Sequence, residues 1–281
     1  MAEMGSWPEG RRLAVVVNVM YEQWSPGSAP GIGPMGNPLG GGALDYQALS
    51  WSDYGARTGI GRLLDQLDSA GVRASVYASG ILAETAPETI AAVTAAGHEL
   101  CAHAWSQDVL LPLLDEAAER DDIARSTEAL ALAGGVRPVG WMSPRCTPSG
   151  RTASLLAAAG YRWTGDVFDA ELPYLLDTAG GPIAALPFGL DVNDLPLFVR
   201  YGAPARELFE RFAYLLGALR REGRPAYLDV TVHAHLAARP AGARALAEIL
   251  ELAATTPECC FATRGEIVDA LVGRGLSASS S

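Results

Sequence analysis

Short apolar runs alternate with amphipathic stretches along almost the whole of this 281-residue chain. Residues 13–20, LAVVVNVM, are apolar and mostly β-branched, which is typical of a strand buried on both faces. Residues 58–71, TGIGRLLDQLDSAG, have apolar side chains at helical spacing and end in glycine, as an amphipathic helix does. Further strands are expected over 72–79, 98–104, 138–145, 161–168, 182–188 and 225–235, and further helices over 86–97, 113–135, 149–160, 205–223 and 241–258. Residues 259–275 are expected to form a short strand followed by a helix.

This alternation predicts an α/β fold with a parallel sheet, and about seven repeats in order predict a barrel. We expect a single domain over residues 12–273, preceded by an N-terminal arm (1–11) and followed by a flexible tail (274–281). Residues 25–54 are rich in glycine and proline and too long for a simple connection, so we expect a lid loop there.

Composition and charge exclude several classes of protein. The net charge is −11, and no run is dense in lysine or arginine, which argues against a nucleic-acid partner. No apolar run is long enough to span a membrane. The four cysteines include the adjacent pair Cys259 and Cys260, which is poorly placed for a disulfide, so we expect a reducing compartment and a cytoplasmic location.

Polar side chains follow the predicted strands at their carboxyl ends, where barrels of this type carry their active sites. They are Glu22, His103, Arg145, Asp166 and His233. Any one of them could be a solvated or structural residue, but their common position favours function. Glu22 is suited to act as a general base, whereas Arg145 and Arg57 are suited to hold a carboxylate or a carbonyl oxygen that gains charge.

The four histidines are the residues best suited to proton transfer or metal binding. His233 and His235 lie on one face if their strand continues, and His98 is expected to be structural. His103 is followed four residues later by Gln107, where a two-histidine metal motif would carry its second histidine. Cys146 has no base paired with it in the sequence, so a thiol nucleophile is not favoured.

Five segments, in order, resemble the polysaccharide deacetylase superfamily, the family four carbohydrate esterases. They are YGARTGIGRLLDQLDSAGVRASVY, AAGHELCAHAWSQD, GWMSPRCTPSGRTASLLAAAGYRW, VTVHAH and FATRGEIVDAL, within residues 12–272. The resemblance is closest to the allantoinase-like and cyclic-imide-hydrolase-like branch. It implies a distorted (β/α)7 TIM-like barrel.

Two departures from the superfamily pattern bear on the chemistry. The metal-dependent members have two adjacent aspartates after the first strand, whereas this chain has Glu22 alone. Their second metal-binding histidine is replaced here by Gln107. Because a catalytic zinc needs about three strong protein ligands, we expect a site without metal or cofactor, as the resemblance to the allantoinase-like branch also implies.

The resemblance implies an amidohydrolase in which Glu22 activates water and His233 protonates the departing nitrogen. Arg145 and Arg57 would then hold the carbonyl oxygen or a polar substrate edge, and His103 would bind substrate. Further substrate contacts are expected from Tyr54, Trp105, Trp24, Gln107, Asp166 and His235. The long lid favours a small cyclic amide, imide or ureide over an extended glycan.

Other functions stay open at this point. One is a metal-dependent N-deacetylase of a small N-acyl compound or glycan, with a divalent ion such as zinc near Glu22 and His103 and a further ligand such as His235. The others are a non-catalytic barrel that binds a small ligand and an interaction scaffold, which no feature favours. We expect a small-molecule substrate, no nucleic-acid or membrane partner and, from the resemblance, a homo-oligomer.

Overall fold

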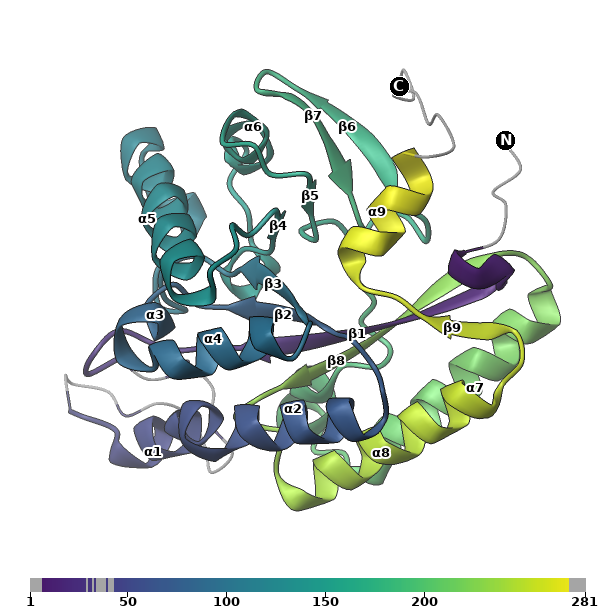
Figure 1. Ribbon diagram of the computed structural model, residues 1–281. Helices are drawn as coiled ribbons and strands as arrows, with labels where there is room; N and C mark the ends of the chain where they lie inside the picture. The colour runs from purple at the N-terminus through teal and green to yellow at the C-terminus, as the bar shows by residue number, and fades with distance from the viewer. Residues whose placement is uncertain (1–6, 29, 32, 34–38, 40–42, 273–281) are drawn as a thin grey trace.

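One curved sheet of nine strands forms the centre of the molecule (Figure 1). The computed structural model describes residues 7–28, 30, 31, 33, 39 and 43–272. Within these residues the strands are β1 (Leu13–Tyr21), β2 (Ser75–Ala78), β3 (Glu99–Ala102), β4 (Gly140–Trp141), β5 (Trp163–Thr164), β6 (Tyr174–Thr178), β7 (Gly181–Ala185), β8 (Ala226–His233) and β9 (Cys259–Phe261). Their order is β6-β7-β5-β4-β3-β2-β1-β8, and β9 pairs with β1.

Helices cover the outside of this sheet (Figure 1). They are α1 (Tyr46–Tyr54), α2 (Ile60–Ser69), α3 (Leu82–Thr85), α4 (Pro87–Ala95), α5 (Glu116–Gly134), α6 (Thr152–Ala158), α7 (Arg206–Glu222), α8 (Pro240–Thr255) and α9 (Arg264–Val272). Two segments, Gly55–Gly59 and Leu195–Arg200, are π-helical. The first of them joins α1 to α2 without a break.

Strand β1 separates two apolar clusters. Alternate residues from Leu13 to Tyr21 pack against the helix layer, whereas Ala14, Val16 and Met20 face the inside of the curved sheet. All nine residues of β1 are buried, as expected for a parallel strand covered on both faces. Ile267 of α9 joins the inner cluster, so α9 closes the end of the barrel at which the strands begin.

The predicted α/β architecture, a distorted barrel of mostly parallel strands, is confirmed. All pairs are parallel except β6 with β7, which form an antiparallel hairpin. In the described part of the chain, the sheet curves without a ladder between β6 and β8, and an isolated bridge joins Asn193 to Thr231 of β8. Strand β6 was not predicted, because residues 174–178 form a short run without a clear boundary.

The expected lid loop over residues 25–54 is only partly a loop. Residues Tyr46–Tyr54 form α1, and the Asp45 carboxylate caps this helix by accepting the Ala48 N–H at 3.0 Å. Glycine and proline are frequent before Asp45 but not after it. The sequence analysis treated both parts as one loop and so did not predict α1. Much of the earlier segment and the tail 274–281 lie outside the described residues.

The N-terminal arm reaches the barrel at its described end. Trp7 is buried and packs edge-on against Tyr227 with ring centroids 6.3 Å apart. Residues 1–6 are outside the described part. No helix among the described residues is both long enough and apolar enough to cross a lipid bilayer.

Candidate active site

The carboxyl ends of three strands bring one carboxylate and three imidazoles together. Glu22 follows β1, His103 follows β3, His233 ends β8 and His235 comes two residues later. The Glu22 carboxylate lies 3.4 Å from His103 Nε2, 4.0 Å from His233 Nε2 and 3.8 Å from His235 Nδ1. The three rings are buried, and the Glu22 side chain is 12% exposed, so solvent reaches this group, the Glu22 cluster, at the carboxylate.

His103 is held by its other ring nitrogen. Its Nδ1–H donates to the carbonyl oxygen of Met142 at 2.7 Å, which links the end of β3 to the residue after β4. A neutral ring with its hydrogen on Nδ1 presents a lone pair at Nε2. Nε2 lies 3.4 Å from a Glu22 oxygen, so His103 donates a hydrogen bond to Glu22 only when both of its ring nitrogens carry hydrogen.

His233 is paired with a buried carboxylate that the sequence analysis missed. Its Nδ1–H donates to Asp194 Oδ1 at 2.6 Å, and Asp194 Oδ2 accepts the backbone N–H groups of His233 and Ala237. Burial lowers the pKa of His233, but the charges of Asp194 and Glu22 outweigh it, and the net effect raises this pKa. Asp194 lies 39 residues before His233, and no local pattern linked the two.

The charges around Glu22 keep it ionised. Burial alone would raise its pKa, but the positive charge on His233, a hydrogen bond from His103 and the His235 ring lower it from 4.5 to about 2. Glu22 is therefore a carboxylate at neutral pH beside an imidazole that favours its protonated form. A general base and a general acid need these two states.

His235 sits in an aromatic setting and remains uncharged. Trp51 and Trp24 pack edge-on against its ring, with centroids 4.7 Å and 5.6 Å away. Burial is the main cause that lowers the pKa of His235, to about 4. Its Nδ1 is buried and has no hydrogen-bond partner among the described residues. Trp51 was not selected from the sequence, because it was read as part of the lid loop.

Gln107 is used for structure. Its side-chain amide donates to Ser79 Oγ and to the His103 carbonyl oxygen, both at 3.0 Å. Among the described residues, no three His, Cys, Asp or Glu side chains are arranged to hold a metal ion. The Gln107 amide is thus engaged by Ser79 and His103 at the position where the superfamily motif has its second metal-binding histidine, and no step below uses a metal.

The loop after β4 carries strain beside the Glu22 cluster. Arg145 and Cys146 have φ angles of 58° and 51°, a left-handed conformation that non-glycine residues rarely adopt. The Arg145 side chain is exposed. Asp166 instead binds the base of this loop through Ser143 N–H and Oγ–H, at 2.8 Å and 2.6 Å. Burial raises the pKa of the Cys146 thiol, which disfavours a thiolate.

The remaining predicted site residues are divided between the site and the surface. Tyr54 lies beneath the Arg239 guanidinium, 4.1 Å from the ring centroid, and its hydroxyl is bound by Arg62. Arg57 points outward and pairs with Asp53, its side chain being 79% exposed.

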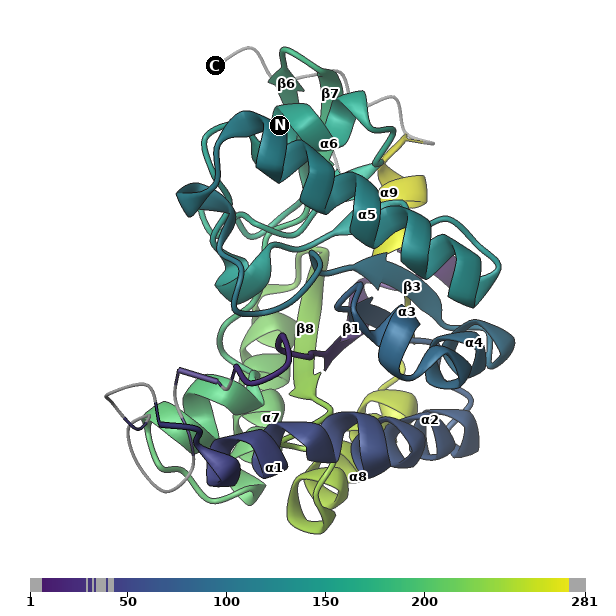
Figure 2. The same cartoon turned by 90° about the vertical axis from the view of Figure 1, so that its left-hand side faces the viewer.

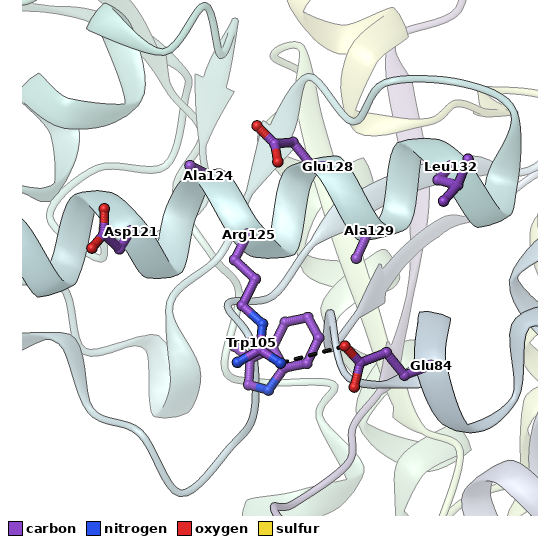
Figure 3. Close-up of a pocket in the computed structure, with 8 residues that line it drawn as sticks. All are labelled: Glu84, Trp105, Asp121, Ala124, Arg125, Glu128, Ala129 and Leu132. Carbon is purple, nitrogen blue, oxygen red and sulfur yellow. Dashed lines mark hydrogen bonds and ion pairs between the residues drawn. The ribbon is translucent and has the colours of Figure 1, made fainter.

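Trp105 turns away from the Glu22 cluster. Arg125 of α5 stacks on its ring at 3.4 Å, and Arg125 also pairs with Glu84 (Figure 3). The pocket around these side chains contains no member of the Glu22 cluster. The structure thus brings Trp24 and His235 to Glu22 and places Arg57 and Trp105 elsewhere.

Comparisons with known proteins point to one family. Residues 48–164 match the family model described as polysaccharide deacetylase. A Schizosaccharomyces pombe protein described as a polysaccharide deacetylase is 24% identical over 305 residues, which cover 94% of this chain and 91% of the relative.

Solved structures extend this similarity over the whole chain. A structure described as a polysaccharide deacetylase from Pseudomonas aeruginosa PAO1 is 28% identical and covers 96% of this chain and 94% of its own, with a TM-score of 0.87. The structure of the Puue allantoinase is 26% identical and covers 97% of this chain and 94% of its own, also with a TM-score of 0.87.

Proposed function

We propose that this chain, whose residues 48–164 match the polysaccharide deacetylase family model, hydrolyses a carbon–nitrogen bond in a small cyclic amide, imide or ureide. In this proposal Glu22 is the general base, and His233 is the general acid. One observation carries it: the Glu22 carboxylate lies 4.0 Å from Nε2 of His233, whose Nδ1 lies 2.6 Å from the buried Asp194 carboxylate.

The proton transfers follow from these two states. Glu22 takes a proton from a water molecule while the water oxygen bonds to the carbonyl carbon and the π electrons move to the carbonyl oxygen. When the carbonyl re-forms, the carbon–nitrogen bond breaks, and His233 gives its proton to the nitrogen. The ring opens to a carboxylic acid and a free N–H group, which belongs to an amine from a cyclic amide, to an amide from an imide and to a urea group from a ureide. A proton passed from Glu22 to His233 restores the starting state.

Two observations support a small cyclic substrate. The carboxylate is open to solvent over only 12% of its side chain, and two tryptophans flank the neighbouring imidazole. Planar rings pack well against such surfaces, and sites for small molecules are mostly apolar with a few polar groups. The similarity to an allantoinase structure agrees with this substrate class.

A metal-dependent N-deacetylase is the second candidate. The observation that favours it is the Nε2 lone pair of His103, which faces Glu22 and would suit a cation as well as a proton. The relatives described as polysaccharide deacetylases agree with this candidate.

The test is hydrolysis of a panel of hydantoin, dihydrouracil, allantoin, succinimide and N-acetylglucosamine oligomers, before and after chelation. We expect ring opening that survives chelation, with less than a tenth of an equivalent of metal by elemental mass spectrometry. Glu22→Gln should lower kcat by about 10²–10⁴-fold. Glu128→Gln on the exposed face of α5 is the matched control and should have no effect. Near-stoichiometric metal with deacetylation of the oligomers would replace this proposal with the second candidate.

A further inference from the structure

His235 combines three features that the general base and general acid leave unexplained. Its ring is 1% exposed, its Nδ1 has no partner among the described residues, and this atom lies 3.8 Å from a Glu22 oxygen. A buried polar atom without a partner costs about 1–3 kcal/mol, so such an atom at a site usually serves a ligand. The distance to Glu22 is too long for a direct hydrogen bond but leaves Nδ1 directed toward the carboxylate.

The position of the His235 ring depends on a close approach of the helix that covers it. Figure 2 shows α1 and α2 as one nearly continuous helix that passes the carboxyl end of β8. A Cβ on Gly55 would lie 3.3 Å from the His235 backbone nitrogen, and a Cβ on Gly59 would lie 1.8 Å from the Ala234 carbonyl oxygen. These glycines therefore let the π-helical segment touch the strand end. Segments of this kind are frequent at functional sites.

The close contact between this helix and the strand end also brings Trp51 against the His235 ring. Trp51 lies one helical turn before Gly55, is 7% exposed, and its ring meets the His235 ring at 84°. The His235 imidazole packs edge-on against two indoles, those of Trp51 and Trp24, and therefore has little freedom to rotate. Trp51 is thus a positioning residue that acts through His235.

The charge of the Glu22 carboxylate determines which tautomer of the His235 ring is favoured. A lone pair on Nδ1 would face the negative charge of Glu22, whereas an N–H would be attracted to it. The favoured ring therefore carries its hydrogen on Nδ1. Because burial keeps the ring uncharged, as its pKa of about 4 reflects, it donates this hydrogen without giving it up.

We infer that the Nδ1–H of His235 holds the substrate carbonyl oxygen while it gains negative charge, with Trp51 fixing the ring. This assignment rests on the proposed function and replaces the role first expected of Arg145, whose side chain is exposed. An oxygen that accepts from Nδ1 would also lie close to the water that Glu22 activates, because Nδ1 is 3.8 Å from the Glu22 carboxylate. A neutral imidazole can polarise a carbonyl in this way. The substrate class is then an uncharged cyclic amide, imide or ureide whose carbonyl oxygen accepts from a single donor.

The variants that test this inference are matched in shape. His235→Asn keeps an N–H donor near the position of Nδ1, and His235→Leu has a similar shape without one. We expect His235→Leu to lower kcat by about 10²–10³-fold with a small change in KM, and His235→Asn to retain most of kcat. Equal losses in the two variants would overturn the inference.

The ratio of kcat for two substrates is independent of the fraction of folded protein, so it separates a loss of the donor from a loss of folding. Wild-type protein should prefer an oxygen substrate over its thiocarbonyl analogue, because sulfur is the weaker acceptor, and His235→Leu should lose this preference. Trp51→Ala should lower kcat about tenfold, and Trp51→Phe should restore it. Retention of the oxygen preference in His235→Leu would overturn the inference and leave the proposed function intact.

Nitrogen-15 NMR of the wild-type imidazoles tests the same point without any substrate. We expect the His235 ring, identified by the loss of its signals in His235→Asn, to be neutral with its hydrogen on Nδ1 down to about pH 4. An Nε2–H tautomer would overturn the inference, as would stoichiometric metal bound at Nδ1. A wild-type protein that opens no ring in the panel would overturn the proposed function and this inference together.

Discussion

Two buried groups of charges, both built on β1 and β8, differ in how completely their hydrogen bonds are formed. In the first group Arg264 donates to Asp229 at 2.5 Å, to Asn18 at 3.2 Å and to the Leu186 carbonyl at 2.9 Å. Asp229 also accepts from Asn18 and from the Gly189 N–H. Arg264 and Asp229 are almost fully buried, and each has its partners in place.

The Glu22 cluster is bonded less completely. Its carboxylate is 3.4–4.0 Å from the three imidazole nitrogens, and the Nδ1 of His235 has no partner among the described residues. Satisfied networks stabilise a fold, whereas groups with unused hydrogen-bonding capacity cost stability and persist where a ligand uses them. The difference agrees with a structural role for Arg264 and Asp229 and with the role proposed for Glu22 and its neighbours in hydrolysis.

The largest expected effect is on stability, from Arg264→Met. It would leave Asp229 buried and without its cation, so the free energy of unfolding should fall by about 3–5 kcal/mol. Urea unfolding followed by circular dichroism measures this. Arg244→Met on α8 is the matched control, since that side chain is 75% exposed and its loss should cost less than about 1 kcal/mol. Equal losses in the two variants would show that the inner ion pair contributes no more than a surface one.

Asp194→Asn tests whether the Asp194 charge keeps His233 in its protonated form. Asp194 and Glu22 raise the pKa of His233 against burial, so His233 is protonated below that pKa and loses its proton as the pH rises through it. Without the Asp194 charge this pKa should fall, and the alkaline limb of kcat should move to lower pH. Because the pKa of Glu22 is about 2, we expect no acid limb between pH 4 and pH 7.

The measurement is kcat between pH 4 and pH 10. We expect a loss of about 10²-fold at pH 8 and a smaller loss at pH 5.5. Asp269→Asn, at a 63% exposed position of α9, controls for the loss of a carboxylate. A loss that is equal at all pH values would mean that Asp194 only supports the backbone at His233 and Ala237.

Some members of the Glu22 cluster could be selected from the sequence because of where they stand. Glu22 and His233 each lie at the end of a β-branched apolar run, and such runs predict buried strands whose ends meet. Asp194 and Trp51 could not be selected in this way. Asp194 reaches His233 across 39 residues, and Trp51 lies in a helix that follows a glycine-rich segment. Their partners are set by packing between distant segments.

The packing of α1 and α2 on the site gives the next prediction. Gly59→Ala would place a Cβ 1.8 Å from the Ala234 carbonyl oxygen and must move the helix or the strand end. We expect a loss of about 1–3 kcal/mol in the free energy of unfolding, together with lower kcat, because His235 follows Ala234 directly. Gly61→Ala, with open space around its Cβ, should instead stabilise α2 by about 0.5–1 kcal/mol. Tm and kcat measured on both variants decide this, and a Gly59→Ala protein with unchanged kcat would separate the helix from the site.

The smallest effect is expected from removing Arg125, which stacks on Trp105. The sequence analysis had placed Trp105 among the substrate contacts. The stacked Arg125 and its pair with Glu84 are on the surface, with both charged side chains more than half exposed. An exposed cation–π contact contributes about 0.5–1 kcal/mol, and an exposed ion pair contributes less. Arg125→Ala should therefore lower the free energy of unfolding by about 1 kcal/mol and leave kcat/KM unchanged. If kcat/KM instead fell more than tenfold, the loop from His103 to Trp105 would connect this surface with the Glu22 cluster, and the two regions would not be independent.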